Sequence, residues 1–373
     1  MNDTQTFVAT CLFGLEKLVG EEIDALGYTR TETIDGRVKF RAPITAMPRL
    51  NINLRFAERV LVEVGTCPAP DFDTLFEGVR AMPWEDYVGK YDAFPVKGHS
   101  IKSKLFSIPD CQKIIKKAAA RRLGSVYGLE FLPEAGLKYQ IEFFIFKDVA
   151  SLMLDTSGTP LHKRGYRPVS TEAPLRETLA AALVKLARPR EDVLFWDPMC
   201  GSGTIATEAA LMMTGTAPGL NRSFAAEAFP WIAPSVWEDA RDEAFDNIRD
   251  TDFQAYASDI DPEAVSIAQE TVRRAGLSKY VKVFQQDALT ITTEGRRGTV
   301  VCNPPYGERL STLEEAEELY RQMGRHFRTL DRWQTYVITS HEGFEKLYGR
   351  RADKVRKLYN GMIPCYYYQF FKK

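Results

Sequence analysis

The stretch DPMCGSGT, Asp197–Thr204, decides how the second half of this 373-residue chain is interpreted. It follows an apolar run, Val193–Trp196, and leads into a helical pattern, Thr204–Met213. Glycines at positions 201 and 203 let the backbone turn tightly against a ligand, and the N-terminus of a helix attracts polar or anionic groups. The stretch therefore predicts a strand, a ligand-binding turn and a helix.

Acidic segments follow the next two apolar runs of the chain. Asp259 and Asp261 come after Ala255–Ser258, and Asp287 comes after Val281–Phe284. A carboxylate at the end of a parallel strand can accept charge-assisted hydrogen bonds from both hydroxyls of a ribose. Each acid alone is also explained as a helix cap, but successive parallel strands end at one edge of a sheet. The residues expected to bind a nucleoside-containing ligand are Asp197, Gly201, Gly203, Asp259, Asp261 and Asp287.

The glycine turn also fits the dinucleotide-binding fingerprint G-x-G-x-x-A, over residues 201–206. That fingerprint requires an acid about 20 residues later, at the end of the next strand. The next strand-end acids stand only at positions 259 and 261. A nicotinamide-dependent oxidoreductase is therefore disfavoured, and a purely structural turn is the plainer alternative.

The segment Asn303-Pro304-Pro305-Tyr306-Gly307, which follows the apolar run Thr299–Cys302, carries the sharpest chemical signal. Prolines lack an N–H, so the turn offers carbonyl oxygens, and the Asn303 side chain offers a second acceptor. Together they can hold both protons of an exocyclic amino group, while Tyr306 stacks on a base that has been turned out of its helix. Guanine N2, adenine N6 and cytosine N4 all satisfy this geometry. The expected catalytic residues are Asn303, Pro304, Pro305 and Tyr306.

A further strand is expected at Tyr336–Thr339, and Asn360-Gly361 is a hairpin signal between Lys354–Tyr359 and Met362–Phe371. The helical pattern before the first of these strands carries Leu175, Leu179, Leu183 and Leu186, with Pro174 in its first turn. Alternating strands and helices indicate a doubly wound, mostly parallel α/β sheet, here closed by an antiparallel hairpin.

The first half of the chain alternates short strands and helices in two α+β units, separated by a Pro- and Asp-rich loop at Cys67–Asp73. The strands expected there are Phe7–Thr10, Arg37–Phe40, Arg59–Val64, Ala93–Lys97, His99–Lys104 and a hairpin of Lys138–Phe146 with Ala150–Asp155. The expected helices are Gly14–Leu26, Ala46–Asn53, Phe72–Ala81 and Asp110–Leu123, the last capped by Asp110.

Positive charge gathers in the second unit although the net charge of the chain is −1. Between Lys97 and Arg122 eight Lys and Arg residues face a single acid, and a second basic run covers Lys346–Lys357. Such runs are commonly solvated surfaces, but two of them in a balanced chain make a polyanion partner plausible. The residues expected to contact nucleic-acid phosphates are Lys113, Lys116, Lys117 and Arg121 on one helical face, and Lys163 and Arg164 in the basic hinge Leu161–Arg167.

Several classes of protein are disfavoured by the sequence. Its longest stretch without charged residues, Leu358–Phe371, is too short and too polar to span a membrane, and Met1–Gly20 lacks the pattern of a signal peptide. Six cysteines without a C-x-x-C motif and four histidines without an H-E-x-x-H spacing argue against a disulfide frame or a zinc site. We expect a cytoplasmic protein without a metal.

In the order of these segments the chain resembles class I S-adenosylmethionine-dependent amino methyltransferases. Asp197–Thr204, Asp259–Pro262, Asp287 and Asn303–Gly307 are similar to motifs I to IV of that class. The upstream basic helix, the LDTSG…LHKRGYR run and the insertion Pro218–Trp231 resemble THUMP-bearing RNA guanine-N2 methyltransferases, above all the bacterial enzymes that modify large-subunit ribosomal RNA. The longer ribosomal enzymes carry a second, fused methyltransferase domain, which this sequence lacks.

The resemblance implies a ferredoxin-like unit at 1–66, a THUMP RNA-binding domain at 67–160 and a seven-stranded methyltransferase domain at 165–373. It implies S-adenosylmethionine as cofactor, S-adenosylhomocysteine as product, and an RNA partner, with ribosomal RNA favoured over transfer RNA. Transfer would be direct and in line, without a metal or a dedicated base. The alternatives are a transfer RNA guanine-N2, a DNA adenine-N6 or a protein glutamine-N5 methyltransferase, and a catalytically silent RNA assembly factor. The target nucleotide and the oligomeric state stay open.

Overall fold

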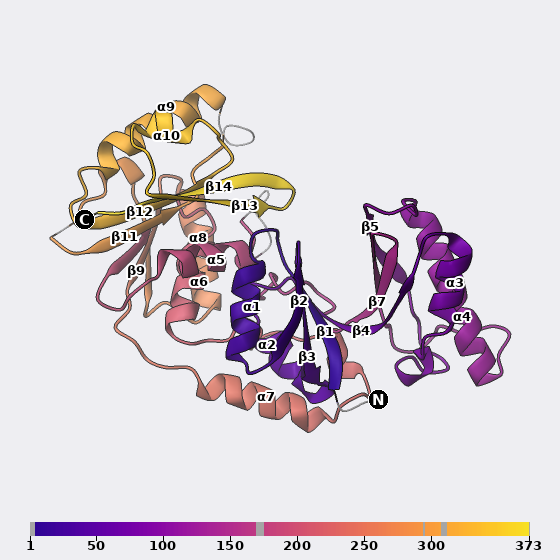
Figure 1. Ribbon diagram of the computed structural model, residues 1–373. Helices are drawn as coiled ribbons and strands as arrows, with labels where there is room; N and C mark the ends of the chain where they lie inside the picture. The colour runs from indigo at the N-terminus through magenta and orange to yellow at the C-terminus, as the bar shows by residue number, and fades with distance from the viewer. Residues whose placement is uncertain (1–3, 169–174, 294, 307–311, 373) are drawn as a thin grey trace.

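The computed structural model describes residues 4–168, 175–293, 295–306 and 312–372. Figure 1 shows two sheets, each with helices packed on it, and the chain passes from one to the other after residue 155. The expected helix start at Pro174, the last residue of the Asn303–Gly307 segment and the terminal residues of the chain lie outside the described ranges.

The first half of the chain forms one seven-stranded sheet in the order β2-β3-β1-β4-β7-β6-β5. Its strands are β1 (Thr4–Thr10), β2 (Thr29–Ile34), β3 (Arg37–Pro43), β4 (Arg59–Pro68), β5 (Val96–Ile101), β6 (Ile141–Phe146) and β7 (Val149–Asp155). Its helices are α1 (Glu16–Ala25), α2 (Met47–Asn53), α3 (Phe72–Arg80) and α4 (Ile108–Tyr127), with short 3₁₀ turns η1 (Ile44–Ala46) and η2 (Trp84–Asp86).

The long strand β4 joins the two α+β units into that single sheet. Its first four residues pair with β1, and Leu61–Pro68 pairs antiparallel with β7, with a bulge between Glu63 and Gly65. A bulge increases the local twist of a strand, so the sheet turns at this point. Because Cys67 and Pro68 still pair with β7, the expected loop at Cys67–Asp73 shrinks to residues 69–71.

The second half forms a seven-stranded sheet in the order β10-β9-β8-β11-β12-β14-β13. Its strands are β8 (Leu194–Asp197), β9 (Ala255–Asp259), β10 (Val281–Gln285), β11 (Gly298–Cys302), β12 (Trp333–Thr339), β13 (Lys354–Asn360) and β14 (Ile363–Phe370). Its helices are α5 (Glu177–Ala187), α6 (Thr204–Met213), α7 (Pro234–Asp246), α8 (Pro262–Arg274), α9 (Leu313–Phe327) and α10 (Phe344–Tyr348), with 3₁₀ turns η3 (Ala225–Ala228) and η4 (Ala288–Thr290).

This second sheet confirms the expected doubly wound architecture. Strands β10, β9, β8, β11 and β12 run parallel, and β14 and β13 add the antiparallel hairpin. Helices α9 and α10 lie on one face, and α5, α6 and α8 on the other (Figure 1). Every residue of β8 and of β11 is buried, as the central strands of a sheet covered on both faces must be.

Other details of the first half also differ from the sequence expectation, which included no strand at β2. The expectation that Asp110 caps a helix is wrong, because α4 begins at Ile108 with Ser107 at the capping position, and the Ser107 hydroxyl donates to the Asp110 carboxylate at 2.6 Å. Pro109, with its fixed φ, suits the first turn and allows the earlier start. The two extended pieces expected between residues 93 and 104 are one strand, β5, which pairs with β6 over six residues.

The insertion between α6 and α7 connects the second half of the chain to the first. The ring of Phe229 stacks on Tyr139 with a centroid separation of 4.3 Å, and the Trp231 indole N–H donates to the carbonyl of Tyr87 at 3.0 Å. One buried apolar cluster includes residues of both sheets. The two halves are therefore packed as one body, and the position of the first sheet relative to the second is fixed.

Candidate active site

The four strand ends singled out in the sequence lie side by side at one edge of the second sheet. Strands β10, β9, β8 and β11 are consecutive neighbours and parallel. Their carboxyl ends therefore deliver Asp287, Asp259, Asp197 and Asn303 to the same edge. In open α/β sheets ligands bind outside the carboxyl ends of the strands, where the strand order reverses, and here it reverses between β8 and β11.

The glycine turn between β8 and α6 has the backbone that only glycine adopts easily. Gly201 has φ +49° and Gly203 has φ +76°. A Cβ at Gly203 would lie 3.0 Å from the Cβ of Ala268 on α8, so this glycine also permits close packing of the two helices. The Gly201 amide donates to the Asp259 carboxylate at 2.9 Å, which ties the turn to the neighbouring strand.

The strand-end acids differ in what they already bind. The Asp259 carboxylate accepts from the amides of Gly201 and Asp261, one on each oxygen. Asp261 caps α8 through the Glu263 amide at 2.9 Å, and Asp287 caps η4 through the Leu289 amide at 2.8 Å. A carboxylate has about four acceptor positions, so these bonds hold the acids in place and leave further acceptor positions open to a ligand.

Asp197 is buried to 1% exposure at the end of β8. The Met199 amide reaches its carboxylate only at 3.4 Å. Burial, and next the charge of Asp259, raise the pKa of Asp197 well above its usual range. A buried carboxylate with one long hydrogen bond favours a cationic ligand beside it, because a positive charge would stabilise its ionised form.

The described part of the segment after β11 is held by one hydrogen bond within it and by one from α9. The Tyr306 hydroxyl donates to the Asn303 side-chain oxygen at 2.5 Å, and the Tyr320 hydroxyl of α9 donates to the Pro305 carbonyl at 2.6 Å. Burial raises the pKa of Tyr320 to about 12, so it stays a donor at neutral pH. The amide of Asn303 is therefore oriented by Tyr306, a contact that the sequence did not predict.

The basic residues of α4 fall into two groups. Lys113, Lys117 and Arg121 are exposed and stand four residues apart, so they form one stripe along the helix. Lys116 lies apart from this stripe: its ammonium contacts Glu134 at 2.5 Å and stands 3.6 Å above the Phe94 ring. Three of the four side chains are therefore exposed, and of these Lys113 lies 3.9 Å from the Asp110 carboxylate.

The hinge residues expected to contact RNA have different environments. Lys163 is exposed, but Arg164 is buried to 4% exposure. The Arg164 guanidinium donates to the carbonyls of Arg55 and Leu161 and to the Glu208 carboxylate. The expectation that Arg164 binds RNA is therefore corrected: its donors are consumed at the junction of the two halves.

That junction centres on Glu208, which the sequence analysis missed. Glu208 is fully buried on α6 and accepts from the Tyr166 hydroxyl at 2.9 Å, from Arg164 at 3.3 Å and from Arg55 at 3.5 Å. Arg55 follows α2 in the first half, and α6 begins at the glycine turn. The sequence does contain a signal for this buried ion pair, because Glu208 is the single carboxylate in the otherwise apolar helix Thr204–Met213.

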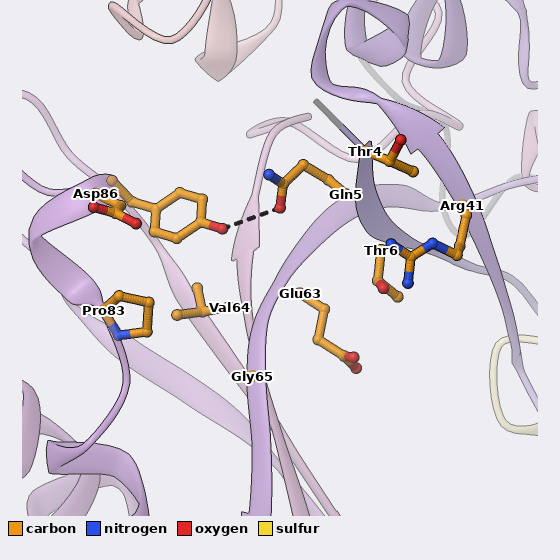
Figure 2. A pocket seen from close by; sticks show the side chains of 10 residues that line it. Thr4, Gln5, Thr6, Arg41, Glu63, Val64, Gly65, Pro83 and Asp86 are labelled. Carbon is orange, nitrogen blue, oxygen red and sulfur yellow. Dashed lines mark hydrogen bonds between the residues drawn. The ribbon is translucent and has the colours of Figure 1, made fainter. Parts of the chain in front are cut away.

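A polar pocket of about 430 Å³ lies at the bend of the first sheet rather than beside the strand-end acids. Figure 2 shows it between the start of β1, the bulge of β4 and the η2 turn, with the Tyr87 hydroxyl donating to the Gln5 side chain. Its walls include Arg41 as well as the acids Glu63 and Asp86. Mixed charge of this kind fits a solvated joint between the two α+β units.

Within the described residues, no helix is long and apolar enough to cross a membrane. The same residues contain no cluster of three His, Cys, Asp or Glu side chains that could hold a metal ion.

Three protein-family models match successive parts of the chain. They describe a ferredoxin-like domain of the RlmL type at residues 6–61, a THUMP domain at 69–155 and an RMKL-like methyltransferase domain at 164–369. The chain belongs to the RMKL-like methyltransferase family. Its fold is that of class I methyltransferases, with the ferredoxin-like and THUMP domains in front, as the sequence predicted.

Two curated members of this family illustrate the range of lengths. The Bacillus subtilis protein named "Putative RNA methyltransferase YpsC" is 44% identical over 371 residues, which cover 99% of this chain and 96% of that protein. The Ribosomal RNA large subunit methyltransferase K/L of Syntrophotalea carbinolica is 33% identical, over 96% of this chain but 52% of that protein. The chain therefore spans about half the length of the K/L relatives.

Two solved structures share the whole fold. One is SMU.472, described as "a putative methyltransferase complexed with SAH", with 39% identity and a TM-score of 0.92 over 100% of this chain and 99% of that one. The other is from Listeria monocytogenes and is described as "a predicted N6-adenine-specific DNA methylase", with 43% identity and a TM-score of 0.92 over 99% and 97%. Both relatives contain the two N-terminal units as well as the methyltransferase half.

Proposed function

We propose that this protein transfers a methyl group from S-adenosylmethionine to the exocyclic N2 amino group of guanine in RNA. The observation that carries the proposal is the anchored Asn303–Tyr306 turn, which ends the strand beside the glycine turn of β8. An amino group held there by two acceptors would point its lone pair toward a ligand bound at the neighbouring strand ends.

The residues at this edge fit the cofactor. Asp259 and Asp287 offer acceptors for a ribose, and buried Asp197 offers a negative charge for the cationic methionine part. The relative SMU.472 is described with bound S-adenosylhomocysteine. When bound, S-adenosylmethionine supplies a methyl group on a positively charged sulfur, which is electrophilic without a metal. The protein contributes the orientation of the two partners and a site from which water is excluded.

The proposed roles at β11 follow from the hydrogen bonds of the turn. Asn303 and the Pro304 carbonyl accept the two amino protons, and the Tyr306 ring stacks on the base. The Tyr320 bond to Pro305 keeps the turn closed while the base enters. The aromatic-like amine releases its proton readily once methylated, so we assign no general base.

The choice of RNA and of guanine depends on the family. The THUMP domain, the exposed stripe of α4 and relatives named for ribosomal RNA methylation support an RNA substrate. We propose ribosomal RNA rather than transfer RNA, a cytoplasmic location, and domain boundaries near residues 66 and 160. The name of the Listeria structure favours adenine N6 in DNA as the second candidate, and the same Asn-Pro-Pro-Tyr geometry accommodates it.

The deciding experiment identifies the product. Undermodified ribosomal RNA, transfer RNA and duplex DNA are each incubated with the protein and labelled S-adenosylmethionine, then digested to nucleosides. We expect label in N2-methylguanosine from ribosomal RNA. Label in N6-methyladenine from DNA, or in protein, would contradict the proposal.

Asp259→Ala is expected to weaken cofactor binding by about ten- to a hundredfold, because charge-assisted hydrogen bonds to a ribose contribute about 1.5–3 kcal/mol. The variant also loses the bond that holds Gly201. Calorimetry with S-adenosylhomocysteine measures the change. Asp252→Ala is the matched control, an exposed acid just before β9, and its affinity should equal that of the wild type. If Asp259→Ala binds S-adenosylhomocysteine as tightly as Asp252→Ala and the wild type do, Asp259 does not contact the cofactor.

Lys117→Ala is expected to weaken RNA binding and to reduce the slope of log affinity against log salt by about one, because one phosphate contact is lost. Lys117 stands in the middle of the exposed α4 stripe. Titrations at several salt concentrations give the slope. The control is Lys185→Ala, an exposed lysine on α5 of the methyltransferase half. If the two variants have the same slope, RNA does not dock on α4.

A further inference from the structure

The hairpin of β13 and β14 meets the candidate active site at its closed end. Because β14 runs antiparallel to β12, the turn between β13 and β14 lies at the edge where the parallel strands end. The Cys365 thiol of β14 lies 3.9 Å from the Tyr306 hydroxyl, and the side chains of Tyr306 and Ile363 pack against the same buried cluster. Met362 in the turn stands three residues before Cys365, about 10 Å along the chain. The turn therefore lies close to the ring that we propose to stack on the target base.

The first half of the chain packs against this hairpin. The ring of Phe13, in the loop between β1 and α1, makes an edge-to-face contact with Tyr359 at a centroid separation of 5.6 Å. Gly14 has φ +92°, and a Cβ there would lie 3.0 Å from the Lys357 carbonyl oxygen, so glycine permits this close approach. In Figure 1 the hairpin extends from the second sheet to the first half, above α1. The surface around the hairpin is therefore built by both halves.

The second basic run of the sequence, Lys346–Lys357, ends in this hairpin. Its single acid, Asp353, pairs with Arg350 at 2.8 Å. Lys354 and Lys357 of β13 are exposed, and neither forms an ion pair with another residue that the structure describes. Two uncompensated positive charges therefore lie along one strand, where they attract a polyanion.

Exposed apolar and aromatic groups accompany these charges. Met362 is 88% exposed and Phe13 is 42% exposed, and the Lys357 ammonium lies 5.6 Å from the centre of the Tyr359 ring. Lysines on an edge strand also prevent pairing with another chain, but the loop at Gly14 already lies against β13 at Lys357, and exposed rings do not serve that purpose. Positive charge beside aromatic rings is typical of surfaces that bind unpaired nucleic acid. The hairpin surface consists of Lys354, Lys357, Tyr359, Met362 and Phe13.

We propose that the hairpin surface binds the unpaired RNA nucleotides next to the target base. This inference rests on the proposed function. A base turned out toward Tyr306 leaves its neighbours without a stacking partner, and Phe13 and Tyr359 offer rings in its place. The two lysines contact the phosphates of the same nucleotides. The hairpin surface and the exposed stripe of α4 then have different partners, since the first binds unpaired RNA and the second binds a stem.

Fluorescence anisotropy on the full chain tests this assignment with two labelled probes. One is a single-stranded RNA of mixed sequence and about 12 nucleotides, a length that suits one single-strand surface. The other is the duplex of that strand with its complement. For the single strand, Lys354→Gln/Lys357→Gln should reduce the slope of log affinity against log salt by about 1.4, because each phosphate contact contributes about 0.7.

Phe13→Ala should weaken binding of the single strand by about five- to a hundredfold, the effect of losing one stacked base. Both variants should bind the duplex within about twofold of the wild type, because a duplex offers no unstacked base. The lysine variant alters only exposed side chains, so its result decides the matter if Phe13→Ala does not fold. The control, Lys185→Gln/Lys282→Gln, removes the same charge from α5 and from β10 at the opposite edge of the sheet. It should bind both probes as the wild type does.

The inference is overturned if the lysine variant has the same slope as the control on the single strand, or if it loses affinity for both probes equally. It is also overturned if the wild type binds the duplex but not the single strand. A wild type that binds neither RNA would contradict the proposed RNA substrate, and the inference with it. That failure is distinguishable because it appears in the unaltered chain with both probes.

Discussion

Asn303→Ala is expected to lower the methylation rate by about a hundredfold or more while leaving the affinity for S-adenosylhomocysteine unchanged. The side chain accepts from the Tyr306 hydroxyl within its own turn, and among the described residues it forms no hydrogen bond with the glycine turn or with the acids after β9 and β10. Its loss removes an acceptor that aligns the amino group, and misalignment by about 1 Å can cost a factor of about 100. Single-turnover rates and calorimetry separate the two quantities.

Tyr306→Phe is the matched variant for this prediction. It keeps the ring that stacks on the base but lacks the hydroxyl that donates to Asn303. We expect a smaller loss of rate with nearly unchanged RNA affinity, whereas Tyr306→Ala should weaken capture of the base by about 1–3 kcal/mol. If the Asn303→Ala protein keeps its methylation rate, other residues align the amino group. If it fails to bind S-adenosylhomocysteine, the prediction that Asn303 acts only on the substrate is wrong.

Glu208→Ala is expected to lower the free energy of unfolding by about 3–5 kcal/mol, the usual cost of removing one member of a buried ion pair. Arg164 would be left buried without its counter-charge, and the Tyr166 hydroxyl would lose its acceptor. Because Arg55 belongs to the first half of the chain and Glu208 to the second, the substitution weakens the contact between the two halves.

Urea denaturation monitored by tryptophan fluorescence tests this prediction, through a lower midpoint or an early separate transition of one half. Glu238→Ala removes an exposed acid on α7 and should shift the midpoint very little. A change below about 1 kcal/mol in Glu208→Ala would mean that the two halves are held together by their apolar contacts alone.

The methyltransferase half could be predicted from the sequence because its signals are local. Buried runs end in acids or in Asn303, glycines with positive φ mark the turn, and Thr204–Met213 begins and ends as expected. An Asn-Gly pair set the final hairpin, which the structure confirms.

The junction could not be predicted because its partners are distant in the sequence. Arg164 stands in a run that looks exposed and basic, and only the folded chain brings Glu208 against it. The continuous first sheet could not be predicted either, because β4 and β7 pair residues that are far apart in the sequence, such as Leu61 and Asp155. Local periodicity describes each strand but contains no information on which strands become neighbours.

The continuous first sheet fixes the distance between helix α4 and the candidate active site of the proposed enzyme. One sheet spans the ferredoxin-like and THUMP domains, and the contacts of Tyr139 and Tyr87 with the insertion hold that sheet against the methyltransferase half. The distance between α4 and Tyr306 is then fixed. With an RNA stem docked on α4 as we propose, only the nucleotide at the matching distance would reach Tyr306, and the choice of target would depend on the spacing between two structural features of the RNA.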